Sequence, residues 1–244
     1  NVWCAAGKGT FGTTELIQRI EATKLAKVVT HRSLILPILG APGVAAFEVT
    51  KSTGFAVRYG TIRAADLPAY LDNGQLTTPA MRELTFTLRE RLVLIPVELV
   101  HALKSTTLIT ACLIILGAAL GGITGGFMAA AAYLGAMVTG VVLGPLLLPW
   151  LPGRSFAIKG AIAGLAWSSA WYLLAGSAGR GLAPTIAAFL ALPAVSAFYT
   201  LNFTGCTPYT SRTGVKREMR RALPAMGGAI LLGVLVLTAG RFLL

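Results

Sequence analysis

The chain of 244 residues carries a net charge of +12 and has 55% hydrophobic against 12% charged residues, a balance typical of a protein that lies largely in a bilayer. Three cysteines are too few for a disulfide framework, and the basic excess lies between apolar runs, so a secreted disulfide scaffold, a disordered acidic tail and a nucleic-acid-binding domain are excluded. Residues 1–102 hold 11 Lys/Arg and 8 Asp/Glu, whereas residues 103–244 hold 10 Lys/Arg and one acidic residue, Glu218. The sequence therefore predicts a soluble first part and a membrane-embedded second part.

Residues 1–102 alternate between helical and strand patterns. Such alternation predicts an α/β fold, in which helices cover a parallel sheet. Three strands make a thin core and the chain begins at Asn1 without an initiator Met, so we expect an upstream segment of the natural protein to supply further strands. The expected elements are a helix from about Thr13 through Ile20, a strand at 26–29, a helix at 43–51, a strand at 55–59, a helix at 64–71 and a strand at 92–97.

Residues 103–244 contain four long runs without charge. The first, 105–153, is long enough for two membrane helices of about 20 residues each, and the runs 160–179, 181–211 and 222–240 hold one each. Glycines recur four residues apart, as at Gly140 and Gly144, which favours close helix packing within one bundle over a dimer interface. The five predicted helices lie near 103–121, 124–149, 156–176, 182–201 and 223–243.

The connections between these helices predict the orientation, because Lys and Arg are retained on the cytoplasmic side. An odd number of spans then puts residues 1–102 in the cytoplasm and Leu244 outside, in a multi-pass protein of the inner (cytoplasmic) membrane. The basic cluster of the fourth connection, within the segment 202–221, either binds anionic lipid headgroups or docks an acidic partner. The second connection carries Arg154 and Lys159, the third only Arg180, and the fourth Arg212, Lys216, Arg217, Arg220 and Arg221.

Cys4 is the first candidate for chemistry. The small residues that follow it leave room for a large flat ligand, and Trp3 offers an apolar wall. With Lys8 close by and a helix start near, the thiol is expected to be present as thiolate, although an ordinary buried cysteine is the plainer alternative. The string G-x-G-x-x-G at 7–12 is a weak nucleotide signature, because no acidic residue stands about 20 positions later.

The run NVWCAAGKG at 1–9 resembles the cap-helix motif of the HgcA family of mercury-methylating corrinoid proteins. The similarity continues through 19–46, 54–74 and 91–100, and through NFTG and YTS within 202–211. It implies a partial Rossmann-like corrinoid-binding domain at 1–102, similar to that of corrinoid iron-sulfur proteins, followed by an all-α five-helix transmembrane domain at 103–244. Family members carry a substantial segment before the motif, so the resemblance also implies that this sequence is N-terminally truncated.

The resemblance implies that the Cys4 thiolate is the lower axial ligand of the corrinoid cobalt. An electron-rich ligand opposite the methyl group should favour its release to Hg(II), because the axial ligand is the protein's main influence on such a cofactor. The usual cobalamin pattern D-x-H-x-x-G is absent, since Val29, His31 and Leu34 do not fit it. The cofactor-binding residues implied are Asn1, Val2, Trp3, Cys4, Ala5, Ala6, Gly7, Lys8 and Gly9.

Electron counting implies the partners. Transfer of methyl with its bonding electrons leaves cobalt(III), which needs two electrons before the next turnover. Cys4, Cys112 and Cys206 are too few and too far apart to hold an iron-sulfur cluster, so a separate ferredoxin-like protein is expected. The resemblance implies that this partner carries two [4Fe-4S] clusters and that the methyl donor is of the methyl-folate type. We expect Cys112 to be a packing residue and Cys206 to be either an inert loop thiol or a handler of Hg(II).

Two other functions fit parts of the sequence. The first is a corrinoid methyl carrier of the acetyl-CoA pathway type, against which the five predicted spans argue. The second is a non-enzymatic membrane scaffold or transporter whose cytoplasmic domain binds a ligand. A transporter is weakened by the lack of an ionisable residue at the middle of any predicted span.

Overall fold

The computed structural model describes residues 6, 10–175, 181–207, 209 and 212–243. The chain divides into two compact units, Asn1–Thr85 and Phe86–Leu244, and most described residues are helical. The boundary between the units lies 17 residues before the predicted domain boundary at 102, because the first helix of the second unit already begins at Leu88. The extents of the corrinoid-binding and membrane domains themselves stay predictions.

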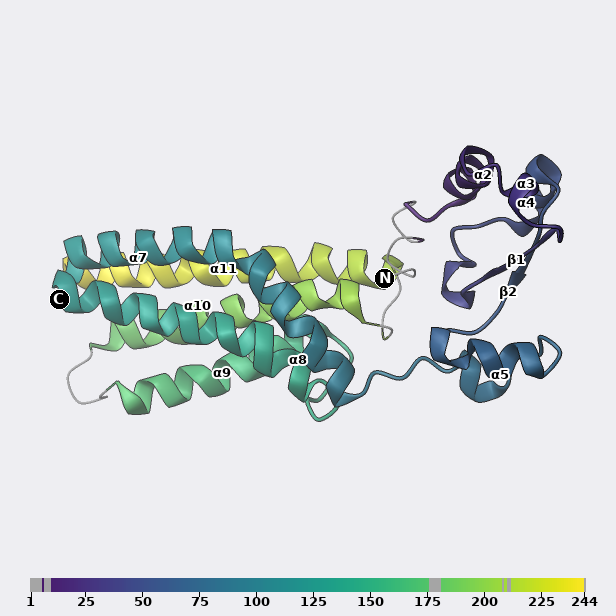
Figure 1. Ribbon diagram of the computed structural model, residues 1–244. Helices are drawn as coiled ribbons and strands as arrows, with labels where there is room; N and C mark the ends of the chain where they lie inside the picture. Colours follow the sequence, from purple (N-terminus) through teal and green to yellow (C-terminus); the bar gives the residue numbers. More distant parts are fainter. Residues whose placement is uncertain (1–5, 7–9, 176–180, 208, 210–211, 244) are drawn as a thin grey trace. The chain divides into compact units, whose positions relative to one another are not determined.

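A short parallel sheet forms the centre of the first unit (Figure 1). Strand β1 (Ser33–Leu36) pairs with β2 (Ala56–Tyr59), with Ser33 opposite Ala56 and Leu36 opposite Tyr59. The chain crosses between them through η1 (Ile38–Gly40) and α4 (Ala46–Thr53), and α2 (Thr13–Ala22) packs against α4. The predicted helix from Thr13 and the predicted strand at 55–59 are thereby confirmed. The core of this unit consists of Ile20, Val44, Val49 and Phe55.

Two predicted strands are helical in the structure. Residues 26–29 lie mainly in α3 (Leu25–Val28), where the Arg32 guanidinium donates hydrogen bonds to the carbonyls of Ala26 and Val29 at 3.0 and 2.9 Å. Residues 92–97 lie in α7, which a Thr87–Glu90 capping box starts just upstream. Within the described residues the sheet therefore has two strands, and the Rossmann-like fold is not confirmed. The first unit also contains η2 (Ala64–Asp66), α5 (Leu67–Asp72) and α6 (Pro79–Arg82).

The second unit is a bundle of helices that run side by side (Figure 1). Helix α7 (Leu88–Val138) reverses direction at Gly122, whose φ of 77° and ψ of 169° suit glycine alone. Its two arms touch closely, because a Cβ added at Gly117 would lie 2.6 Å from the Gly126 Cα. The other elements are the π-helical turn η3 (Thr139–Leu143), α8 (Gly144–Leu147), α9 (Phe156–Leu174), α10 (Leu182–Asn202), η5 (Phe203–Cys206) and α11 (Arg212–Leu243).

Three helices among the described residues are long and apolar enough to cross a membrane. They are Leu88–Leu147, counted as one stretch although it folds back at Gly122, Leu182–Asn202 and Thr213–Gly240. This composition is consistent with a membrane protein. Helical segments occupy all five predicted positions, but the number of membrane crossings stays a prediction.

Helix α10 lies at the centre of the bundle, and its small residues pack against glycines of the neighbouring helical segments. A Cβ added at Gly160 would lie 2.7 Å from the Ala197 Cα, and one at Gly140 would lie 2.5 Å from the Ser196 carbonyl oxygen. The buried Thr200 hydroxyl donates a hydrogen bond to the Gly140 carbonyl at 3.0 Å. These glycines pack within the bundle, as the sequence predicted, and leave no room for side chains at the crossings.

One end of the bundle is fixed by two charged residues. Arg91, only 4% exposed, donates hydrogen bonds to the carbonyls of Pro145 and Leu146, so the start of α7 is tied to the end of α8. Glu218 on α11 accepts hydrogen bonds from the Ser155 hydroxyl at 2.7 Å and the Ala157 amide at 2.8 Å, which caps α9. Both contacts satisfy groups that a helix end leaves open.

The connection between α10 and α11 is shorter than the sequence predicts. Helix α11 begins at Arg212 instead of about 223, because Lys216–Arg221 are good helix formers and Glu218 anchors this extension to α9. The buried hydroxyls of Thr204 and Thr207 donate hydrogen bonds to the carbonyls of Leu201 and Thr204. The Thr204 hydroxyl therefore closes the end of α10, and the Thr207 hydroxyl closes η5.

We predict that Gly164→Ala destabilises the bundle, because the added Cβ would lie 2.6 Å from the Pro193 Cα and 2.8 Å from the Ser196 Cβ. Forcing α9 and α10 apart should lower the free energy of unfolding by about 1–3 kcal/mol. The matched control is Gly227→Ala on α11, where no atom lies within 4 Å of the added Cβ. Unfolding of both variants in detergent checks this, and equal stabilities would contradict the packing described.

Candidate functional site

Ala6 is the one member of the predicted cofactor segment that the structure describes. The segment is Asn1–Gly9, and its other members, including Cys4, Trp3 and Lys8, lie outside the described residues. Ala6 is 7% exposed and packs against Gly43 in the turn that follows β1. The residue two positions after Cys4 is therefore held against the protein.

Two glycines allow this close approach. A Cβ added at Gly43 would lie 2.5 Å from the Phe11 carbonyl oxygen and 3.0 Å from the Ala6 Cα. A Cβ added at Gly40 would lie 2.6 Å from Cε1 of the Phe11 ring. The Thr13 amide adds a hydrogen bond of 3.1 Å to the Gly43 carbonyl, so the start of α2 is tied to the same turn. A larger residue would clash at either position, because the Phe11 ring covers Gly40 and the backbone of Ala6 and Phe11 covers Gly43.

This contact lies at the carboxyl end of the parallel strands. The segment Pro37–Gly43 follows β1 directly, and Gly60 follows β2. The Tyr59 hydroxyl, at the last residue of β2, donates a hydrogen bond of 2.5 Å to the Val44 carbonyl and closes this edge. The carboxyl ends of parallel strands are where open α/β sheets bind their ligands. Ala6, the one described member of the predicted cofactor segment, thus lies at the edge at which ligands are expected.

The described part of the G-x-G-x-x-G string, residues 10–12, gives no support to nucleotide binding. A phosphate would need free amides at the start of the helix that follows the string. The amide of Thr13, the first residue of α2, is already bonded to the Gly43 carbonyl, and the Phe11 ring packs on Gly40. We therefore do not assign this string to a nucleotide.

Polar chemistry elsewhere in the first unit is sparse. Glu15 and Arg19 form an exposed ion pair at 2.7 Å, which raises the pKa of Arg19 through a hydrogen bond and charge attraction and has little effect on stability. The part of the chain that the structure describes contains no group of three His, Cys, Asp or Glu residues that could hold a metal ion. The single predicted axial ligand, Cys4, lies outside that part.

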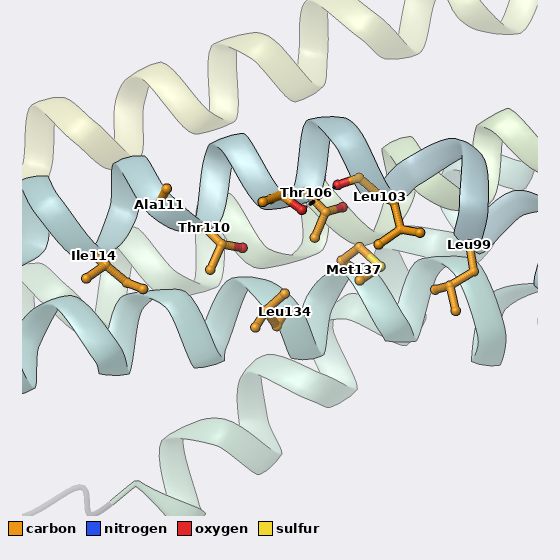
Figure 2. A pocket seen from close by; sticks show the side chains of 9 residues that line it. Leu99, Leu103, Thr106, Thr110, Ala111, Ile114, Leu134 and Met137 are labelled. Carbon is orange, nitrogen blue, oxygen red and sulfur yellow. Dashed lines mark hydrogen bonds between the residues drawn. The ribbon is translucent and has the colours of Figure 1, made fainter.

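A second candidate site is an open groove of about 490 Å³ between the two arms of α7 (Figure 2). Its walls are mostly aliphatic, with the hydroxyls of Thr106, Thr107 and Thr110 on one arm and Leu134 and Met137 on the other. A buried hydroxyl chain begins at its floor, as the Thr106 Oγ1 lies 3.2 Å from the Tyr199 hydroxyl. That hydroxyl in turn lies 2.9 Å from the Tyr133 hydroxyl. Sequence reasoning missed this chain, because single Thr and Tyr residues in apolar helices give no periodic signal.

The two remaining cysteines, Cys112 and Cys206, belong to the second unit. Cys112, which the sequence predicts as a packing residue, lies in the first arm of α7 and is exposed. Cys206 ends η5, and its side chain lies outside the described set. Neither an inert nor a mercury-handling role for Cys206 is tested.

Comparisons of this chain with known protein families, with curated proteins and with solved structures find no match.

We predict that Gly43→Ala weakens the contact between the turn after β1 and the predicted cofactor segment, Asn1–Gly9, which we also call the cap segment. The new Cβ would strike the Phe11 carbonyl and the Ala6 Cα. A strain of about 1–3 kcal/mol should raise the population of detached segment at least about fivefold. Trypsin cleavage after Lys8 measures this population. Ala41→Ser, a change at an exposed neighbour, is the control and should leave cleavage unchanged; equal rates for both variants would rule out the proposed contact.

Proposed function

We propose that this chain is a membrane-anchored corrinoid-dependent methyltransferase that passes a methyl group to Hg(II) and so forms methylmercury. The proposal rests on the resemblance of residues 1–9 to the cap-helix motif of mercury-methylating corrinoid proteins. The structural observation that carries it is the burial of Ala6 against Gly43 at the carboxyl end of β1, which fits a cap segment that presents Cys4 beside the sheet edge.

The sequence around Cys4 and the turn beneath Ala6 both suit a large, flat cofactor. Ala5, Ala6, Gly7 and Gly9 have minimal side chains, and the turn beneath Ala6 is itself built on glycine. Such a surface lets a planar ring approach the backbone without steric conflict. A corrinoid with one protein axial ligand also needs a single donor, so it is compatible with a site that lacks a multidentate ligand cluster among the described residues.

In this proposal, residues of the chain bind the cofactor, orient it and shield it from water. Cys4 binds the cobalt through its thiolate, Trp3 excludes water from one side, and Asn1 and Lys8 donate hydrogen bonds to polar groups of the cofactor. The bound corrinoid supplies a cobalt that accepts a methyl group and releases it with its bonding electrons to a soft cation. The Gly43 contact positions the cap segment, so that the thiolate is presented from a fixed backbone.

The remaining components come from outside the chain. Each transfer of methyl with its electron pair consumes two electrons, and three scattered cysteines cannot hold the cluster that would supply them. A ferredoxin-like partner with two [4Fe-4S] clusters therefore supplies the electrons, and a methyl-folate-type donor supplies the methyl group. Binding of Hg(II) requires no further site in this proposal.

The bundle serves as the anchor, with five membrane helices, the first unit in the cytoplasm and Leu244 outside. The antiparallel course of α9 against α10 and of α10 against α11 supports an up-and-down arrangement, as Gly164 meets Pro193 and Gly233 meets Ala187. The buried hydroxyls of Thr200 and Ser168 bond to backbone carbonyls, which favours packing over a transport pathway. An anchor explains the bundle without any ion-coupled step.

We predict that Cys4→Ala abolishes methylmercury formation by the anaerobically prepared protein and strongly reduces its cobalt content. Loss of the thiolate removes the ligand that the proposal assigns to the cobalt. Methylmercury yield, cobalt analysis and the absorption spectrum of the same preparations are the measurements.

Cys112→Ala is the matched control, because it removes a thiol from α7 and should leave methylmercury yield and cobalt content unchanged. Undiminished methylation by the Cys4→Ala variant would overturn the mechanism. Absence of corrinoid from the wild-type protein would instead favour a membrane scaffold.

The orientation makes a separate prediction. A green fluorescent protein fused after Gly153 should fluoresce because this connection is cytoplasmic, whereas one fused after Leu244 should remain dark when exported. Alkaline phosphatase fused at the same two positions should give the opposite pattern. Fluorescence at Leu244 would contradict an outside C-terminus.

A further inference from the structure

The second and third turns of α11 carry a basic face that makes no ion pair with the described residues of the bundle. We define the α11 basic face as Lys216, Arg217, Arg220 and Arg221, all of which are exposed. Their spacing of i, i+1, i+4 and i+5 places them on one side of the helix. The opposite side, with Val215, Glu218, Ala222 and Met226, is half-buried or buried, and Ala222 and Met226 pack in the bundle core.

The charge of this face is not balanced within the bundle. Glu218 is the single carboxylate of residues 103–244, and it is engaged with the Ser155 hydroxyl and the Ala157 amide of α9. Among the described side chains, none of the four cations takes part in an ion pair. The like charges also repel each other within two i,i+4 pairs, Lys216–Arg220 and Arg217–Arg221. A counter-charge from outside the chain would therefore stabilise this helix end.

The position of the face indicates the kind of counter-charge. Arg221 directly precedes the uncharged run 222–240 of α11, which is long and apolar enough to cross a membrane. Two amphipathic aromatic side chains of the same unit, Trp150 and Tyr209, are 69% and 58% exposed. Trp150 lies under the Arg91 guanidinium near the start of α7, and Tyr209 contacts Phe86, which immediately precedes that helix. Exposed aromatics beside cations at the end of a span mark the headgroup layer.

We infer that the α11 basic face binds the phosphate groups of anionic phospholipids, such as phosphatidylglycerol, in preference to zwitterionic ones. The anchoring of Glu218 to α9 fixes the rotation of α11, so that its cations point away from the bundle toward the headgroups. Guanidinium and ammonium groups both match phosphate oxygens, and several cations close together prefer a surface that is rich in them. The inference is independent of the corrinoid chemistry.

The test uses the full chain in non-ionic detergent micelles that contain equal amounts of phosphatidylglycerol and phosphatidylcholine. Native mass spectrometry counts the retained molecules of each lipid. The wild type should retain phosphatidylglycerol preferentially, and the variant K216Q/R217Q/R220Q/R221Q should lose at least tenfold of this preference. Each cation near an anionic surface raises the binding constant about fivefold. Loss of all four cations should therefore reduce the lipid preference by at least about tenfold.

Two control variants separate charge from fold. The charge-preserving variant K216R/R217K/R220K/R221K should keep the preference, because total charge is unchanged. Neutralising four exposed cations of the first unit, by changing Lys24, Lys27, Lys51 and Arg82 to Gln, should also keep it. On the wild type, raising the salt concentration from 0.1 to 1 M should reduce the preference, as screening shortens the range of the attraction.

Three outcomes would overturn the inference. The first is equal retention of the two lipids by the wild type, and the second is an unchanged preference in the neutralised variant. The third is displacement of phosphatidylglycerol by a poly-glutamate peptide added at equal charge, which would assign the face to an acidic protein. Insensitivity to salt would contradict the electrostatic argument even if a variant failed to fold.

Discussion

Backbone contact across glycine is the constraint on which both units depend. In the bundle, α10 approaches α9 and η3 so closely that Gly140, Gly160 and Gly164 leave no room for a Cβ. Within lipid the hydrophobic effect does not drive helices together, so such close packing and interhelical hydrogen bonds must stabilise the bundle. In the first unit, Gly40 and Gly43 likewise let Ala6 and Phe11 lie directly on the turn after β1.

The contact at Gly43 in the first unit connects the fold to the proposed chemistry. A cap segment is useful only if it presents its ligand from a fixed position, and the Gly43 contact supplies that fixed position two residues from Cys4. The sheet beneath it has two described strands and a small core, so its own stability is modest. A large cofactor bound at the carboxyl edge would add stability to the folded state through linkage.

Charge gives the bundle two different ends. Arg91 and Glu218 are both engaged at one end, where they close the ends of α8 and α9, and the cations of α11 remain exposed near it. The opposite turn, at Gly122, lies in a charge-free run. This asymmetry supports the proposed membrane orientation, and it leaves the basic face available for the proposed lipid contact.

The sequence by itself determined the division into a charged first part and an apolar second part, the positions of five helical segments and the role of the spaced glycines, because these follow from composition and period. The Cys4 motif was also evident in the sequence, although its ligand stays a proposal. The tertiary structure decided that residues 26–28 and 92–97 are helical, since short apolar runs suit both helix and strand until a capping box or the Arg32 hydrogen bonds select one. It alone showed that Gly43 receives Ala6 and that Glu218 caps α9, because contacts between residues far apart in the chain form only when the helices pack.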